Sequence, residues 1–574
     1  MEIRRATLSR SSPAKTMSVS SRLWIRCLDT ALASATSPFL ISLSHGHLAK
    51  NSFKAYIAQD AFYLVSFKQA FANAATICRK DSDGFGVVHF ESLETLIEGE
   101  LEMHAKFALD LDIDLTSVRP FPQTLLYTEF LSEASKTNYV SHICAAMTPC
   151  MTLYGFLGRR AKAAGLLEVS NPYARWIEEY SSPEFTANSE RLEMLLDHFA
   201  AKDNQKFEDL IKLYAKAMEL EYNFFSAHET PNWTGISPSF LGVDFDDTIS
   251  VGDTISNLCK AGLKAQGKSD EADYDDLFVK YLAQYEAFMS SNLPQVGSST
   301  TYRGNDLELF MKTYSAFEDG MLIPVEDSGI LKGISASTLN ILAASMLMKP
   351  NAIETMKFAT HNHPGMELHI LSVNWSKRFL ESMIKVQWPE SKISVHANEL
   401  DGLQESISAD SISTGMIEKR LTGPLQKGEL LRKLFDADRS KSDGPRVYIG
   451  DSIGDLSALL EADIGIVIGT SSSLRKVCSI YGIKLQSLDC LMSQKSAEML
   501  VKDSIGQPSL YIAESWAHIG FCVFGNTYVT SWLRSFIRDI NHDIASPLKD
   551  KGIEKKMFTV LSVAGSDSGV KFHS

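Results

Sequence analysis

The second half of this chain contains the stretch Gly242-Val243-Asp244-Phe245-Asp246-Asp247-Thr248, a short apolar run that delivers carboxylates at its C-terminal end. An apolar run of this kind predicts a buried parallel strand. In open α/β sheets, ligand and catalytic groups gather just beyond the carboxyl ends of such strands. The stretch therefore predicts a strand of a parallel sheet that leads into a group of catalytic carboxylates.

A second stretch has the same form. Val447-Tyr448-Ile449-Gly450-Asp451-Ser452-Ile453-Gly454-Asp455 is again apolar and again ends in carboxylates. Two strand ends that carry aspartate can share Mg²⁺, which prefers oxygen ligands. One aspartate can then attack phosphorus and form an aspartyl-phosphate. The alternative interpretation is that these aspartates are helix caps and turn residues.

Four sequence motifs support the catalytic interpretation because they occur in a fixed order. They resemble the motifs of the haloacid dehalogenase (HAD) phosphatase superfamily: Asp244-x-Asp246-x-Thr248, Ser372 after Leu368–Leu371, Lys427 within Gly423–Gly428, and Asp451 with Asp455. A lone DxDxT motif is a weak signal, whereas four motifs in order are a strong one. The resemblance implies a Rossmann-like α/β domain.

The HAD resemblance also implies roles for these residues. Asp244 would be the nucleophile and Asp246 the general acid and base, with Thr248 in support. Mg²⁺ would be held by Asp244, the backbone carbonyl of Asp246, and Asp451.

Two further side chains would bind the phosphoryl oxygens, namely Ser372 and Lys427, and Asp455 would orient Lys427 or a metal-bound water. Other cations lie near Lys427 in the sequence and remain alternatives to it: Lys419, Arg432 and Lys433.

Composition narrows the class of protein. A chain of 574 residues is expected to hold more than one domain. The net charge of −14 argues against a nucleic-acid partner, and we identify no apolar run long enough to span a membrane. The eight cysteines are scattered without a CxxC pair, which favours a reducing compartment over a disulfide framework or a zinc knuckle. The sequon Asn374-Trp375-Ser376 follows a predicted buried strand, so we interpret it as chance.

Residues 1–28 have the composition of an organelle transit peptide. They contain six basic residues, many serines and one acidic residue, Glu2. Mitochondria are the expected destination and plastids the alternative. The other interpretation is an untargeted tail. Met17 is a second start position that would remove four of the six basic residues and give a cytosolic form.

The first half of the chain, from about residue 30 to 228, shows apolar residues at helical spacing with proline and glycine at the breaks. This pattern predicts an all-α bundle, in which polar side chains on apolar faces would line a central site. Taken one at a time, each such residue is better explained as part of the core, because a buried cysteine is usually inert.

The combination of polar residues in this half resembles the TenA family, also called thiaminase II or aminopyrimidine aminohydrolase. The matching residues are Gln59-Asp60 with Tyr63, Tyr127-Thr128, Pro149-Cys150 with Tyr154, Trp176 with Tyr180, and Glu221 ahead of Phe224-Phe225. The resemblance covers residues 25–228 and implies a haem-oxygenase-like bundle. Phe225 departs from the family, which often has tryptophan there, and the match of Tyr180 crosses a variable stretch.

The TenA resemblance implies a mechanism for the bundle. Asp60 would bind the aminopyrimidine, Cys150 would be the nucleophile, and Glu221 would donate and accept protons. The tyrosines Tyr63, Tyr127, Tyr154 and Tyr180 would contact the substrate. A soft nucleophile suits displacement at a methylene carbon, and burial can raise the pKa of a carboxyl group toward neutrality.

These features predict five segments: a transit peptide at 1–28, a TenA-like domain at 29–229, a linker at 230–239, a HAD-like domain at 240–500, and a C-terminal extension at 501–574. A helical insertion at about 252–365 resembles a HAD cap, which closes over small substrates. The extension is expected either to complete the phosphatase domain or to dock against the bundle.

A TenA-like domain fused to a HAD phosphatase resembles a family of plant bifunctional proteins. This resemblance implies a Mg²⁺-dependent thiamin monophosphate phosphatase and an aminopyrimidine aminohydrolase in one chain. Two alternatives remain: a phosphatase of broad specificity with a helical partner module, or a helical module that binds thiamin or a pyrimidine without turnover. We expect small-molecule substrates, no nucleic acid, no membrane, and a homo-oligomer formed through the TenA-like domain.

Overall fold

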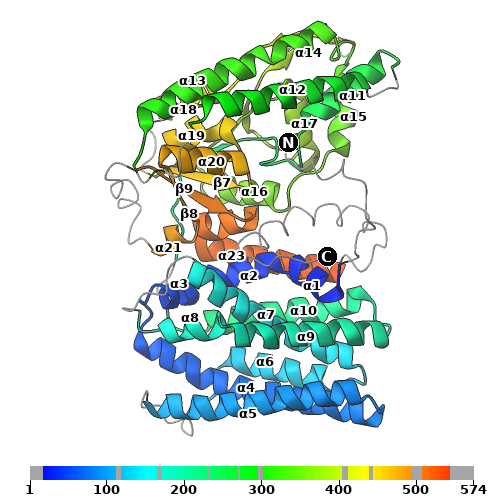
Figure 1. The fold of residues 1–574 in the computed structure, drawn as a ribbon, viewed down its shortest axis with the longest axis vertical. Coiled ribbons are helices and arrows are strands. Elements are labelled where there is room, and N and C mark those ends of the chain that lie inside the picture. The colour runs from blue at the N-terminus through cyan, green and yellow to red at the C-terminus, as the bar shows by residue number, and fades with distance from the viewer. Residues whose placement is uncertain are drawn as a thin grey trace. The chain divides into compact units, whose positions relative to one another are not determined.

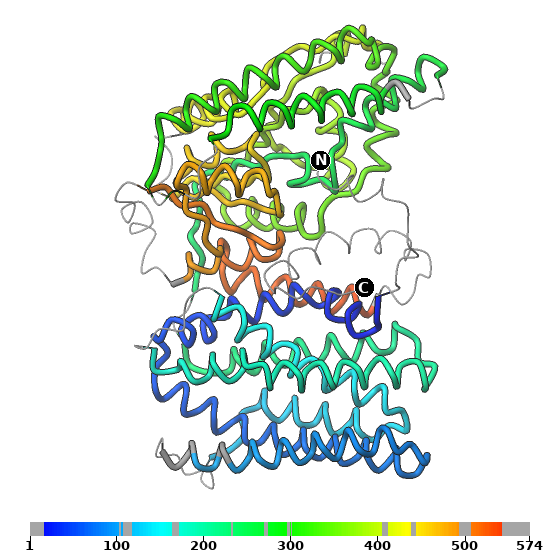
Figure 2. The backbone as a smooth tube through the Cα atoms, in the orientation of Figure 1, coloured from blue at the N-terminus to red at the C-terminus, as the bar shows by residue number. Residues whose placement is uncertain are grey.

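The computed structural model describes residues 17–110, 118–163, 171–230, 233–268, 272–294, 299, 301–403, 411–438, 444–493 and 507–542. The chain divides into two compact units. The helical unit contains the described residues up to 234 and those from 525 onward, and the sheet unit contains Gly235–Phe524 (Figure 2). This architecture confirms the expected helical domain followed by an α/β domain.

The helical unit is a bundle of long helices. They are α1 (Val19–Arg26), α2 (Leu28–Ala35), α3 (Pro38–Ser44), α4 (Lys50–Lys80), α5 (Gly84–Asp110), α6 (Pro122–Ala134), α7 (Val140–Ala163), α8 (Ala174–Tyr180), α9 (Pro183–Lys202) and α10 (Phe207–Ser226) (Figure 1). Local sequence explains where several begin. Ser37 and Ser182 cap α3 and α9 through their side chains, and each is followed by proline at the first helical position.

Helix α7 lies in the core of the bundle and carries Cys150. It is long and apolar enough to cross a membrane, but 83% of its most apolar window is buried inside the unit. That burial is what the central helix of a bundle requires.

The structure corrects the N-terminal boundary. Helix α1 lies within the segment that composition assigns to the transit peptide, yet Leu23 and the following Cys27 are fully buried. Ser20 also donates to Asp197 on α9 from its backbone nitrogen, at 2.7 Å, and from its hydroxyl, at 2.8 Å. The helical domain therefore begins near residue 18, not at residue 29. The first 16 residues lie outside the described part of the chain.

The sheet unit is built on seven parallel strands in the order β3-β2-β1-β6-β7-β9-β8. The strands are β1 (Phe240–Val243), β2 (Glu367–Leu371), β3 (Ser394–His396), β6 (Arg446–Gly450), β7 (Ile464–Ile468), β8 (Lys484–Ser487) and β9 (Ser509–Ala513). All four residues of β1 are buried, as expected for a strand with neighbours on both sides. β1 pairs with β2 on one side and β6 on the other, so the three strands that carry the predicted motifs are adjacent.

Helices connect these strands and flank the sheet: α16 (Ala352–Asn362), α17 (Lys377–Gln387), α18 (Pro424–Asp438), α19 (Leu456–Glu461), α20 (Ser472–Tyr481), α21 (Cys490–Ser493) and the short 3₁₀ helix η2 (Ile453–Asp455). A separate two-stranded sheet pairs β4 (Glu399–Leu400) with β5 (Ile417–Glu418).

A helical insertion follows β1, as predicted. It contains α11 (Ile255–Ala265), α12 (Ala272–Asn292), α13 (Gly304–Gly320), α14 (Leu322–Ser328) and α15 (Ala336–Ser345). The two segments that connect it to the sheet meet at an antiparallel bridge between Ser250 and Met348. The insertion therefore ends near residue 348, not 365, and α16 belongs to the sheet domain, where the Thr355 hydroxyl donates to the backbone oxygen of Trp516.

The C-terminal extension belongs to both units. β9 inserts between β7 and β8, so the extension completes the sheet. Helix α23 (Trp516–His542) follows, and Gly525 interrupts it with φ 67° and ψ −158°. The residues before Gly525 belong to the sheet unit and those after it to the helical unit, where Ile540 joins the buried core.

Candidate active sites

The carboxyl ends of β1 and β6 bring three aspartates together. Val243 is opposite Ile449 in the register of the two strands, so Asp244 and Asp451 leave the sheet nearly side by side. Side-chain oxygens of Asp244, Asp451 and Asp455 all lie within 4.8 Å of one another. The strand pairing thus explains why carboxylates more than 200 residues apart in sequence share one place.

Lys427 lies between two of these carboxylates. Its Nζ is 2.6 Å from Oδ1 of Asp244 and 2.7 Å from Oδ1 of Asp455, and all three side chains are buried. Two of the alternative cations pair elsewhere, Lys419 with Glu326 and Arg432 with Glu461. The structure therefore favours Lys427 as the cation of the site.

Tyr448 holds Asp455 in place from β6. Its hydroxyl donates to Oδ1 of Asp455 at 2.9 Å. The Tyr448 ring covers Gly242, where a Cβ atom would come within 2.7 Å of Cδ2 of the ring. Glycine at this point of β1 therefore makes room for the tyrosine that orients Asp455.

Asp246 points to a different set of partners. Its Oδ1 accepts hydrogen bonds from the backbone nitrogen of Thr254, at 2.8 Å, and from the Thr254 hydroxyl, at 2.6 Å. Its Oδ2 accepts from Nδ2 of Asn374 at 2.9 Å. Asn374 is fully buried, in agreement with the interpretation of its sequon as chance.

The two other motif residues also lie at the sheet edge. The Thr248 hydroxyl donates to Oδ2 of Asp244 at 3.1 Å. Ser372 follows β2, next to β1, and its hydroxyl oxygen accepts from the backbone nitrogen of Asn374 at 3.1 Å. These contacts fix Asp244 and the Ser372 hydroxyl before any substrate arrives.

The site carries an excess of buried negative charge. Burial, followed by the nearby charge of Asp455, raises the pKa of Asp244 to about 7 even though Lys427 opposes the shift. Burial and the same neighbour raise the pKa of Asp451. The two carboxylates raise the pKa of Lys427 against the effect of its burial, so it stays cationic. A set of buried carboxylate oxygens that favours added positive charge fits a hard divalent cation such as Mg²⁺.

A second lysine was missed by sequence reasoning. Nζ of Lys349, at the end of the insertion, donates to the backbone oxygen of Asp247. Burial lowers the pKa of Lys349, while the carboxylates of Asp247, Asp451 and Asp244 raise it. Asp247 itself has φ 55°, a left-handed conformation that aspartate tolerates better than most residues.

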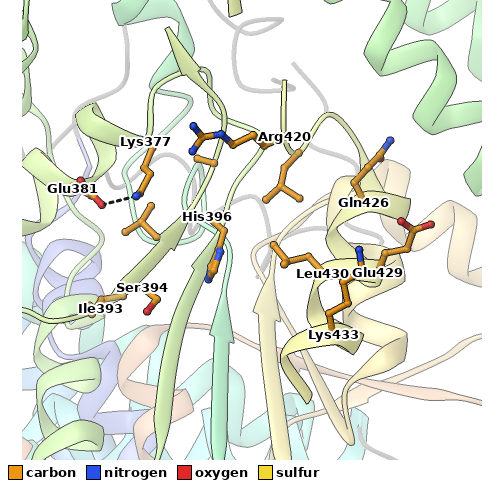
Figure 3. Close-up of a pocket in the computed structure, with 13 residues that line it drawn as sticks. Lys377, Glu381, Ile393, Ser394, His396, Arg420, Gln426, Glu429, Leu430 and Lys433 are labelled. Carbon is orange, nitrogen blue, oxygen red and sulfur yellow. Dashed lines mark ion pairs between the residues drawn. The ribbon is translucent and has the colours of Figure 1, made fainter. Parts of the chain in front are cut away.

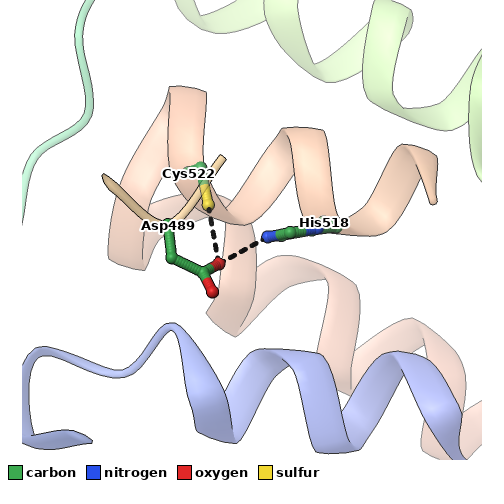
Figure 4. A group of neighbouring side chains, drawn as sticks. All are labelled: Asp489, His518 and Cys522. Atoms are coloured by element: carbon green, nitrogen blue, oxygen red, sulfur yellow. Dashed lines mark hydrogen bonds and ion pairs between the residues drawn. The ribbon is translucent and has the colours of Figure 1, made fainter. Parts of the chain in front are cut away.

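Another cluster of possible metal ligands lies where β8 and β9 end. Nε2 of His518 is 2.6 Å from Oδ1 of Asp489, and Sγ of Cys522 is 3.9 Å from the same oxygen (Figure 4). The backbone nitrogen of Glu514 donates to Nδ1 of His518 at 3.2 Å, so the ring proton is on Nε2 and is donated to Asp489. This tautomer offers no nitrogen lone pair to a metal, and we interpret the cluster as a structural hydrogen-bond set.

A cavity of about 590 Å³ lies along β3, at the edge of the sheet. Its lining includes Lys377, Arg420 and Lys433, and Lys377 is paired with Glu381 at 3.5 Å (Figure 3). None of the predicted catalytic residues lines it. The cavity is therefore distinct from the carboxylate cluster.

The helical unit gathers its predicted residues around Glu221. The Tyr127 hydroxyl donates to Oε1 of Glu221 at 2.7 Å, and the Tyr63 hydroxyl lies 3.4 Å from that of Tyr127. Cys150, directly after Pro149 in α7, is half-buried and interacts with Tyr63 and Glu221. Residues from α4, α6, α7 and α10 thus meet at one place.

A second set of rings lies beside this group. The Tyr154 hydroxyl lies 3.4 Å from that of Tyr56, which also accepts from Nε1 of Trp176 at 3.2 Å. The ring centroids of Tyr154 and Tyr180 are 4.8 Å apart, so Tyr180 joins the cluster despite its variable surroundings in sequence. Phe225 packs on Tyr154 with centroids 5.5 Å apart, which supports a packing role for it.

The two carboxyl groups of the bundle have strongly shifted pKa values. Burial raises the pKa of Asp60 to about 7. Burial raises that of Glu221 to about 8, although hydrogen bonds from Tyr127 and Cys150 oppose the shift. Burial and then the charge of Glu221 raise the pKa of the Cys150 thiol. A proton-carrying carboxyl group beside a thiol can relay protons at neutral pH.

Comparisons with known proteins found proteins that are similar to each half of the chain. The family model described as TENA/THI-4/PQQC family matches residues 31–230. The protein described as "Bifunctional TH2 protein, mitochondrial" from Arabidopsis thaliana is 30% identical over 562 residues, covering 88% of this chain and 89% of that protein. An aminopyrimidine aminohydrolase from Halalkalibacterium halodurans is 25% identical over 213 residues, covering 36% of this chain and 94% of that enzyme. A solved structure of phosphoserine phosphatase with a phospho-aspartyl intermediate analogue matches with 16% identity and a TM-score of 0.27, covering 49% of this chain and 97% of that one.

Proposed function

Because this chain belongs to the family of the bifunctional TH2 protein, we propose that it is a bifunctional hydrolase of thiamin metabolism. The sheet unit removes phosphate from thiamin monophosphate. The helical unit hydrolyses aminomethyl-pyrimidine breakdown products of thiamin to the hydroxymethyl-pyrimidine. The phosphatase activity is supported by the buried arrangement of Asp244, Lys427 and Asp455 at adjacent strand ends.

In the phosphatase reaction, an oxygen of Asp244 forms a bond to phosphorus as the ester oxygen leaves. Asp246 gives its proton to that leaving oxygen, and burial favours the protonated form because it raises the pKa of Asp246. Water then attacks the aspartyl-phosphate and returns a proton to Asp246, which releases phosphate and restores Asp244. Lys427 and Ser372 bind the phosphoryl oxygens and offset their negative charge.

The same carboxylates are suited to hold Mg²⁺. Asp244, Asp451 and the backbone carbonyl of Asp246 would be its ligands, and the ion would supply charge neutralisation for the transferring phosphoryl group. Asp455 already accepts hydrogen bonds from Lys427, from Tyr448 and from the backbone nitrogens of Asp451 and Ser452. Its role is therefore to position Lys427.

In the helical unit, Cys150 displaces ammonia from the methylene carbon of the pyrimidine. Glu221 relays the thiol proton to the leaving amine. Water then displaces the sulfur from the methylene carbon, and a proton of that water returns to the sulfur of Cys150. Asp60 binds the exocyclic amine, and Tyr63, Tyr127, Tyr154 and Tyr180 surround the ring. The observation that supports this assignment is the hydrogen-bonded group of Glu221, Tyr127 and Tyr63 next to Cys150.

The test uses the purified full chain and both reactions. Release of phosphate from thiamin monophosphate should need Mg²⁺ and stop when a chelator removes it. Release of ammonia from aminomethyl-pyrimidine should continue in the chelator, because Cys150 and Glu221 need no metal. Phosphate release that is equal for many unrelated small esters would favour a phosphatase of broad specificity instead.

We also propose a mitochondrial location and a homo-oligomer. The mitochondrial relative and the basic, serine-rich N-terminus support the location. The TenA-like domain supports the oligomer only by resemblance. Import assays and light scattering of the purified chain test the two statements.

A further inference from the structure

The cap contains a carboxylate surrounded by aromatic rings. Glu318 lies near the end of α13, and its Oε1 accepts a hydrogen bond from the Tyr281 hydroxyl on α12 at 3.0 Å. The two helices run side by side (Figure 1). Tyr281 is 6.3 Å from Phe317 and 6.1 Å from Tyr285, measured between ring centroids. All four side chains are half-buried, so part of each is accessible to solvent.

Among the described residues, no lysine, arginine or histidine forms an ion pair with this carboxylate, and no cation contributes to the shift of its pKa. Its hydrogen-bond donor is the phenol hydroxyl of Tyr281. Burial raises the pKa of Glu318, and the phenol groups of Tyr314 and Tyr281 oppose the shift. A sheltered carboxylate without a cation favours a positively charged ligand. The faces of aromatic rings attract cations as well.

The helix that carries Glu318 contacts a segment of the phosphatase site. Ser315 lies three residues before Glu318 on α13, and its hydroxyl oxygen accepts a hydrogen bond from the backbone nitrogen of Leu425 at 3.2 Å. Leu425 belongs to the segment that carries Lys427, whose Nζ is 2.6 Å from Oδ1 of Asp244. Glu318 therefore lies one helical turn from the contact between the cap and this segment.

We propose that Glu318, with the rings of Tyr281, Tyr285 and Phe317, forms a subsite for a cationic aromatic ring carried by the phosphate ester. The inference rests on the proposed phosphatase activity, because the phosphate of thiamin monophosphate is joined to a thiazolium ring that is always positively charged. Phosphate binds at the strand ends and the cation binds in the cap. A neutral phosphate ester uses only the first of these sites.

The first test replaces the charge and keeps the shape. Glu318→Gln in the full chain should raise the KM for thiamin monophosphate at least tenfold and leave kcat within about threefold. Hydrolysis of p-nitrophenyl phosphate, which has a neutral ring, should stay within twofold. Asp319→Asn is the matched control, since it removes a carboxylate from the next, exposed position of the same helix. Its kinetics should be unchanged with both substrates.

Equal losses on both substrates would show that Glu318 only supports the cap, and unchanged kinetics would also overturn the subsite. A second measurement separates the subsite from the choice of substrate. Thiamin, which is cationic but lacks phosphate, should inhibit p-nitrophenyl phosphate hydrolysis at least tenfold more strongly in the wild-type chain than in Glu318→Gln. Equal inhibition overturns the subsite, whereas failure of the wild-type chain to hydrolyse thiamin monophosphate, with the inhibition difference intact, refutes the proposed substrate alone.

Discussion

At the scale of single residues, Glu221 illustrates how burial prepares a side chain for chemistry. It is 1% exposed, and its hydrogen-bond partner Tyr127 is equally buried. Loss of solvation disfavours the charged carboxylate, which is the main reason that its pKa rises to about 8. The same burial makes the stability of the bundle depend on pH.

Glu221→Gln should flatten that dependence. The pKa of Glu221 is about 8 in the folded protein and 4.5 for an ordinary glutamate, so folding favours the protonated form. Its contribution to the free energy of unfolding is fully present below about pH 4.5 and is lost as the pH rises through about 8, with a limiting slope of about 1.4 kcal/mol per pH unit. Urea unfolding of the full chain between pH 5 and pH 9 measures the slope. Glu208→Gln, an exposed change on the same helix, is the control. An identical slope in wild type and Glu221→Gln would contradict the burial argument.

The motif residues could be predicted from sequence, but several of their partners could not. Asp244, Asp451 and Lys427 follow recognisable motifs, and the structure brings all three together. Asn374 and Thr254 were missed, because each acts through a contact with Asp246 that no local pattern contains. Asn374 could have been noted as a polar residue directly after a predicted buried strand, where ligand-binding groups gather.

At the scale of elements, the position of the C-terminal extension in the sheet could not be predicted from the sequence. The extension was expected either to complete the phosphatase domain or to dock against the bundle. The place of its strand between β7 and β8 could not be predicted, because strand order depends on pairing between distant segments. The boundary predicted at residue 28, between the transit peptide and the helical domain, was wrong because of the basic residues in α1. Arginines in α1 resembled targeting residues, whereas Arg22 lies 4.3 Å from the centre of the Phe207 ring and covers it.

Trp516 joins the C-terminal extension to the first motif, which ends at Thr248. Its Nε1 donates to the backbone oxygen of Thr248 at 2.8 Å, and the ring is fully buried. Trp516→Phe should leave this carbonyl unpaired and lower the free energy of unfolding of the sheet unit by about 1–3 kcal/mol. Phosphatase activity should fall with it, while ammonia release stays within twofold. Chemical unfolding and both assays on the variant measure this. Unchanged stability would mean that the extension does not support the Asp244 loop.

At the scale of the whole molecule, the contacts of α1 define which N-terminal truncations should fold. A chain that starts at Met17 keeps α1 and its contacts with Asp197, so it should fold, retain both activities and enter mitochondria poorly. A chain that starts at Asp29 loses the buried Leu23 and Cys27 and should unfold more easily. Reporter fusions and thermal unfolding compare the three chains. Equal import of the full chain and the Met17 chain would remove the transit-peptide interpretation.

The two sites are expected to act independently of one another. The chain passes between the units at residues 234–235 and again at 524–525, and no residue of one motif set belongs to the other. Changes at distant sites without shared partners usually add. Cys150→Ala should therefore abolish ammonia release and leave hydrolysis of thiamin monophosphate within about twofold, a difference of about 0.4 kcal/mol.

Asp244→Asn should do the reverse, because it keeps the size of the side chain but removes the nucleophile. Its phosphatase rate should fall by several orders of magnitude, and a rate above about a tenth of wild type, about 1.4 kcal/mol in the barrier, would refute the assignment.

Both reactions are run on both purified variants. A folded Cys150→Ala protein with a crippled phosphatase would show that the units are coupled and that the bundle regulates the sheet unit. Ammonia release that survives Cys150→Ala would instead make Cys150 a core cysteine, since its half-buried thiol beside Glu221 would then have no part in turnover.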